Sequence, residues 1–87
     1  MLLGIATLQV RATHLLIPMD NTQKNHLKAY GLAYWVLENQ VNINWLLNYR
    51  GGSFMMKHIR AIEEELIIRG ISFEVIADVK STAILRE

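Results

Sequence analysis

The strongest constraint on the fold is a change of pattern between residues 45 and 54. Residues 45–47, Trp-Leu-Leu, have the continuous apolar character of a buried strand. They lead into Arg50-Gly51-Gly52-Ser53, and amphipathic helical spacing begins at Phe54. A strand, a glycine turn and a helix N-terminus in succession are typical of α/β proteins. Ligands bind at such corners because backbone N–H groups and the helix dipole face a common point. The pattern therefore indicates where a site lies, without indicating its chemistry.

Composition limits the chain to one domain and excludes several classes of function. Its 87 residues are near the lower limit for a self-sufficient core. The net charge is +1, and Arg11 accounts for it, because eight basic and eight acidic residues follow. Such a chain has no basic field that would attract nucleic acid. It contains no cysteine, which excludes disulfides, thiolate metal sites and a cysteine nucleophile.

The first twelve residues resemble a secretory signal. Residues 1–10 are mostly apolar, and Val10-Arg11-Ala12 places small residues at the two positions that a signal peptidase recognises. We therefore interpret residues 1–12 as a signal-peptide remnant and expect a secreted or periplasmic protein. A short extra strand is the alternative. The run is too short for a stable membrane span, which needs about 20 apolar residues.

The remaining residues alternate between strand and helix patterns. Strands are predicted at residues 14–19, 41–47 and 71–76, and helices at 22–38, 54–69 and from 78 onward. This β-α-β-α-β-α order predicts a three-layer αβα fold with a parallel sheet and right-handed crossovers, flavodoxin-like in class. The last helix has no stop signal before residue 87. We expect residues 13–87 to be the N-terminal portion of a larger α/β domain, whose remaining chain completes the sheet.

The helix predicted at residues 22–38 carries two apolar stripes. One stripe consists of Leu27, Tyr30, Tyr34 and Leu37. The other consists of Ala29, Leu32, Ala33 and Val36. Two stripes predict a helix that is buried over most of its later surface.

Polar residues at the ends of the first two predicted strands form the candidate ligand site. The carboxyl ends of parallel strands meet at one edge of a sheet, so the two loops would border one crevice there. The candidates are Asp20, Asn21, Gln23, Asn48, Arg50, Gly51, Gly52 and Ser53. The ligand would be a small anion or carboxylate, held by backbone N–H groups and by Arg50.

Simpler interpretations of these residues remain open. The two glycines make a tight turn, Ser53 caps the following helix, and Arg50 pairs with a surface acid. Asp20 and Gln23 have the spacing of a helix capping box. The three histidines show no metal-ligand spacing, and Ser53 lacks the context of a nucleophile elbow. The sequence therefore indicates no catalytic set, no metal site and no cofactor within these residues.

Several segments together resemble one known family. They are Leu16-Ile17-Pro18-Met19-Asp20, the run from Asn25 to Gly31, Tyr34-Trp35, the run from Trp45 to Phe54, and Arg69-Gly70. In these segments the chain resembles secreted bacterial proteins labelled asparagine synthetase B. Members of that family are several times longer and are similar in fold to class I glutamine amidotransferases. The resemblance implies an open parallel sheet and a secreted location, and it assigns no catalytic residue here.

Three functional hypotheses follow. The leading one is a secreted or periplasmic, amidotransferase-like α/β domain that binds a ligand or is a pseudo-enzyme. The second is an amide-transferring or hydrolytic enzyme whose catalytic residues lie beyond Glu87. The third is a structural or partner-binding module in which the glycine turn serves geometry alone.

Overall fold

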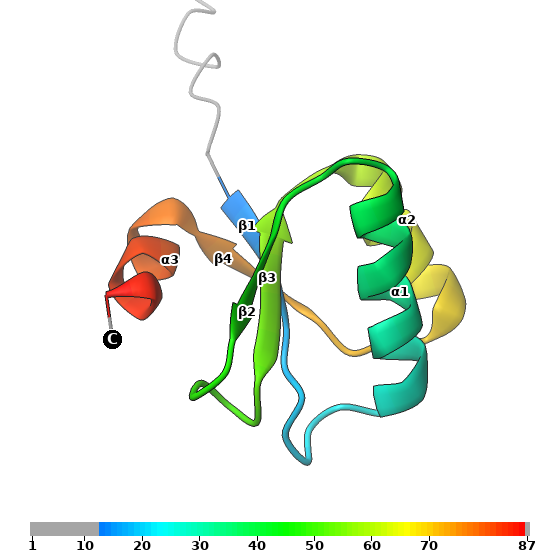
Figure 1. Ribbon diagram of the computed structural model, residues 1–87, viewed down its shortest axis with the longest axis horizontal. Coiled ribbons are helices and arrows are strands. Elements are labelled where there is room, and N and C mark those ends of the chain that lie inside the picture. Colours follow the sequence, from blue (N-terminus) through cyan, green and yellow to red (C-terminus); the bar gives the residue numbers. More distant parts are fainter. Residues whose placement is uncertain (1–12, 87) are drawn as a thin grey trace, which may run out of the picture.

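The computed structural model describes residues 13–86, which form one sheet and three helices (Figure 1). The elements in chain order are β1 (Thr13–Ile17), α1 (His26–Glu38), β2 (Ile43–Leu46), β3 (Ser53–Lys57), α2 (Arg60–Arg69), β4 (Glu74–Ala77) and α3 (Asp78–Leu85).

The sheet is antiparallel throughout, with the strand order β2-β3-β1-β4. Leu15 pairs with Met56 on one side and with Val75 on the other, and Trp45 pairs with Phe54. The predicted parallel sheet, and with it the flavodoxin-like and amidotransferase-like αβα fold, is therefore wrong. The observed β-α-β-β-α-β order is the split arrangement of ferredoxin-like folds, followed here by α3.

The prediction of a parallel sheet is wrong for a specific reason, which is that the residues of one strand have the sequence pattern of a helix. Residues 53–57 form the central strand β3, whereas the sequence predicts a helix from residue 54 to 69. Met55, Ile59, Ile62 and Leu66 have helical spacing, but residues 53–56 are all buried because both faces of β3 are covered. A short, fully buried strand has no alternation to distinguish it from a helix.

Helix boundaries follow local capping chemistry. Asn25, and not Asp20, caps α1, since its side chain accepts a hydrogen bond from the Lys28 backbone N–H. Gly70 ends α2 in the left-handed conformation, with φ of 69°, as the sequence predicts. The predicted ion pairs along α2, Arg60 with Glu64 and Arg69 with Glu65, are also present.

Helices cover both faces of the sheet, with two on one side and one on the other (Figure 1). Leu15, Ile17 and Met56 face α1 and α2, and with the buried stripe of α1 they form the larger core. On the opposite face, Leu16 and Met55 pack with Ile84 of α3. Within the described part of the chain, the second face is thus covered by a single short helix.

Two of the predictions concern membranes and targeting. The predicted signal remnant, residues 1–12, lies outside the described residues. Among the helices within residues 13–86, none combines the length and the apolar character needed to cross a bilayer.

Candidate functional site

The segment Arg50-Gly51-Gly52-Ser53 belongs to the turn between β2 and β3. It does not start a helix, so the predicted strand-to-helix corner is wrong, and Ser53 is the first residue of a strand. Arg50, Gly51 and Gly52 have φ values of 46°, 80° and 91°. A side chain at Gly51 would place its Cβ 2.8 Å from the Met19 carbonyl oxygen, so only glycine fits against the β1–α1 loop.

Two backbone N–H groups of this turn are engaged within the protein. The Gly52 and Ser53 N–H groups donate to the Tyr49 carbonyl at 3.1 and 3.0 Å. The Ser53 hydroxyl, which is buried, donates to the same oxygen at 2.9 Å. These two N–H groups, which the sequence suggested for an anion, would have to leave Tyr49 to bind one.

The Arg50 guanidinium links its own turn to the β1–α1 loop and to the first residue of β4. Its Nε donates to Asp20 Oδ2 at 3.0 Å, its Nη1 to Glu74 Oε2 at 2.7 Å, and its Nη2 to Thr22 Oγ1 at 3.1 Å. The loops that carry Asp20 and Arg50 meet, as the sequence suggested, although β3 lies between β1 and β2. Glu74 was not predicted, because the pairing that brings β4 to β1 leaves no local signal near Glu74.

The positive charge of Arg50 is already paired within this cluster. Hydrogen bonds from Thr22 and then from Arg50 lower the pKa of Asp20 from 3.8 to about 2. Glu74 and Asp20 in turn raise the pKa of Arg50 above its usual value. One guanidinium faces two carboxylates, so a bound anion would have to displace one of them. The anion site predicted at Arg50 stays a prediction. The simpler interpretation, in which Arg50 pairs with acidic side chains, describes the contacts observed.

The other candidates of the β1–α1 loop have mainly structural contacts. The buried Gln23 side chain donates to the carbonyls of Pro18 and Ser72, both at 2.9 Å. Its Oε1 accepts from the Ser72 and Asn25 N–H groups, at 2.8 and 3.2 Å. Gln23 therefore ties this loop to the segment before β4. Asn21 is exposed.

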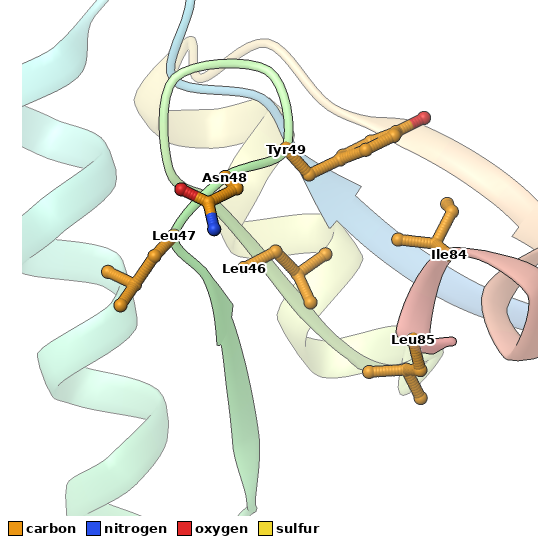
Figure 2. Close-up of a pocket in the computed structure, with 6 residues that line it drawn as sticks. All are labelled: Leu46, Leu47, Asn48, Tyr49, Ile84 and Leu85. Carbon is orange, nitrogen blue, oxygen red and sulfur yellow. The ribbon is translucent and has the colours of Figure 1, made fainter. Parts of the chain in front are cut away.

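Asn48 is the candidate that faces an open hollow. The hollow has a volume of about 370 Å³ and lies between the β2–β3 turn and α3 (Figure 2). Its lining consists of Leu46, Leu47, Asn48, Tyr49, Ile84 and Leu85. Four aliphatic side chains with one amide and one phenol suit a small, largely apolar ligand better than an anion.

Histidines make three side-chain contacts that the sequence did not indicate. His58 Nδ1 lies 2.6 Å from Thr13 Oγ1, and His58 Nε2 lies 2.6 Å from Glu63 Oε1. His14 Nδ1 lies 2.6 Å from Asp78 Oδ1. His58 thus links the start of β1 to the first turn of α2, and His14 links β1 to the first turn of α3. Within residues 13–86, no three side chains of the metal-binding types gather at one place.

The least expected feature is an exposed apolar surface, which we name the α1 flank. It consists of one stripe of α1 and two residues in and just after β2: Leu27, Tyr30, Tyr34, Leu37, Trp45 and Leu47. Each of these side chains is more than half exposed. The sequence showed the helical stripe but predicted that it would be buried. Trp45 stacks on Phe54, and the Tyr30 ring meets the edge of Phe54, so the surface is continuous from β2 to α1.

Comparison with known proteins adds no relative. The chain matches no family model, no curated protein and no solved structure. The resemblance to proteins labelled asparagine synthetase B thus stays a prediction.

Proposed function

We propose that this chain is a protein-interaction module and that the α1 flank is its docking surface. The observation that carries the proposal is the second apolar stripe of α1, which faces solvent along the whole helix. Leu27 is 82% exposed and Tyr34 is 66% exposed, although either could be polar without loss to the core. Contiguous apolar surface of this kind marks interaction sites in soluble domains.

The composition of the α1 flank supports a protein as the partner. Three of its six members are aromatic, and none is charged. Enrichment in aromatic residues and depletion of charge distinguish the central part of protein interfaces from other surface. The four helical members recur at spacings of three, four and three residues, which is the seam spacing of helices that pack against each other.

The first experiment tests whether the α1 flank is a free surface or part of the fold. The double substitution Leu27→Gln with Tyr34→Gln should leave the melting temperature almost unchanged and should reduce binding of an apolar fluorescent dye. As a matched control on the same helix, Leu32→Ala should lower stability by about 2 to 5 kcal/mol, because Leu32 is fully buried. Equal destabilisation by both variants would show that the stripe is structural, and the proposal would then fail.

The hollow beside Asn48 favours ligand binding as a second candidate function. Its aliphatic walls and the two polar groups of Asn48 and Tyr49 are the features of a small-molecule site. A small aromatic alcohol such as phenol should then raise the melting temperature, and Leu46→Gln should abolish the increase. Sulfate and glutamate test the anion site predicted from the sequence. Its prediction fails if Arg50→Ala leaves any stabilisation by these anions unchanged.

The remaining proposals are those of location and enzymatic activity. We propose secretion from the pattern of residues 1–12, and N-terminal sequencing of the mature protein tests it. Retention of Met1 would contradict it. An amide-transferring or hydrolytic activity with catalytic residues beyond Glu87 also stays a proposal, which rests on the family resemblance alone.

A further inference from the structure

We infer that the partner of the α1 flank is a second copy of this chain, joined through the β2 edge. In this arrangement a two-fold axis perpendicular to the sheet makes the two β2 strands antiparallel neighbours. The two sheets become one sheet of eight strands, and the two α1 helices lie side by side on one face. This inference rests on the proposed function and adds the identity of the partner.

The first support is the unprotected edge of the sheet. β2 is the outermost strand on its side, so its outward backbone groups have no partner strand in the described sheet. Sheet edges are usually blunted by lysine, proline or inward-pointing charges. β2 has the sequence Ile-Asn-Trp-Leu and contains none of these. The opposite edge differs, because β4 begins at the ion-paired Glu74 and is followed directly by Asp78.

The second support is that α1 presents its stripe on the same side as this edge. The Arg69 guanidinium lies 5.4 Å from the Trp35 ring, which places that side of α1 against α2. The Tyr30 ring approaches Phe54, which in turn stacks on Trp45 of β2. The stripe and the β2 edge therefore form one surface, and Figure 1 shows α1 and β2 together in the foreground, with α2 behind them.

The third support is the spacing that such symmetry would impose. Neighbouring strands are about 4.8 Å apart. If α1 of each copy is centred above its own β2 and β3, the axes of the two α1 helices would lie roughly 10 Å apart. This distance is at the upper end of the usual range for packed helices. Tyr30 and Leu37 would fill the space between them. Close to the axis a two-fold contact brings identical residues together, and the α1 flank has no charged member that would repel its own copy there.

Charge substitution at the β2 edge tests this arrangement directly. Asn42 and Asn44 are exposed. A two-fold axis perpendicular to the sheet places the Asn42 and Asn44 side chains of both copies on the same face of the joined sheet. The full chain should sediment as a dimer in analytical ultracentrifugation. Replacing both residues with lysine, or both with glutamate, should weaken each homodimer by roughly tenfold through like-charge repulsion across the strands. A mixture of the two variants should form a heterodimer that is tighter than either homodimer.

The outcomes separate this inference from the proposed function. Lys80→Glu on α3 serves as the control, since it changes the charge away from β2 and should leave the dimer intact. A chain that stays monomeric at millimolar concentration overturns the inference, as does a dimer with no preference between the oppositely charged variants. If dye binding still depends on Leu27 and Tyr34 in that monomeric chain, the docking surface stands and another protein occupies it. If the α1 flank proves structural, the proposed function fails irrespective of the oligomeric state.

Discussion

Arg50 links more of the chain than its place in a turn would suggest. It contacts Asp20 and Thr22 in the β1–α1 loop and Glu74 in β4, so one side chain fixes three segments. Partly exposed ion pairs contribute only about 0 to 1 kcal/mol each. We therefore regard the network as a device that positions loops, with a modest share in overall stability.

The Asp20 carboxylate makes part of the stability depend on pH. Its pKa falls from 3.8 to about 2 in the folded chain, so the contribution is complete above pH 4 and is lost as the pH falls towards 2. Asp20→Asn should lower the melting temperature at pH 7 and reduce the further decrease between pH 4 and pH 2. Thermal denaturation of both proteins across this range measures the difference. Parallel curves for the two proteins would contradict the role given to Asp20.

Two glycines should respond to alanine in opposite directions. Gly51→Ala combines a positive φ with a Cβ 2.8 Å from the Met19 carbonyl oxygen, and it should cost at least about 1 to 2 kcal/mol. Gly31→Ala lies within α1 with no atom near the added Cβ, and it should stabilise the chain by about 0.5 to 1 kcal/mol. Denaturant titration gives both values. Equal effects of the two substitutions on stability would mean that the geometry of the turn does not require glycine at position 51.

Among the helices and strands, the sequence predicts the local structure of a segment better than it predicts which strands pair with each other. The C-terminal ends of α1 and α2 and the two stripes of α1 were predictable from side-chain spacing and the Gly70 stop. Both N-terminal ends were predicted too early, at residues 22 and 54, because Asp20 does not cap α1 and residues 53–57 form a strand. The strand β3 was not, because its four buried residues satisfy a helical and an extended pattern equally well. Once β3 is assigned to a helix, the order of elements implies a parallel sheet.

The same limit explains what was missed at the candidate site. Asp20 and Arg50 were recognised from their positions after apolar strands. Glu74 joins them only through the β1–β4 pairing, which spans most of the chain. The exposure of the α1 flank could not be predicted from the sequence either, because helical spacing shows that an apolar stripe exists but not what covers it.

The helix α3 should contribute less stability than α2. It places Ile84 on the face formed by Leu16 and Met55, and no other helix of residues 13–86 covers that face. Ile84→Ala should cost about 2 kcal/mol, at the low end for a buried isoleucine, since the hollow beside it lets the site relax. Leu66→Ala in α2 should cost more, because Leu66 lies fully buried in the larger core. Comparing both variants by chemical denaturation checks this order.

For the whole molecule, the inferred dimer makes stability depend on concentration. A partner that binds only the folded chain raises the melting temperature as protein concentration increases. The wild-type chain should show this increase, and the variant with lysine at Asn42 and Asn44 should show less of it. Calorimetry over a hundredfold range of concentration measures the effect. A wild-type melting temperature independent of concentration would count against self-association.

The antiparallel topology also has a consequence for how quickly the chain folds. Among the three strand pairings, β2 with β3 joins neighbours in the chain, whereas β1 must find Met56 and Val75 far along it. Closing those long loops is slow relative to forming a hairpin. The turn that contains Gly51 would therefore form early and then recruit β1. Trp45, whose indole N–H donates to the Gly52 carbonyl at 3.1 Å, would report this first event in temperature-jump fluorescence, which resolves microseconds.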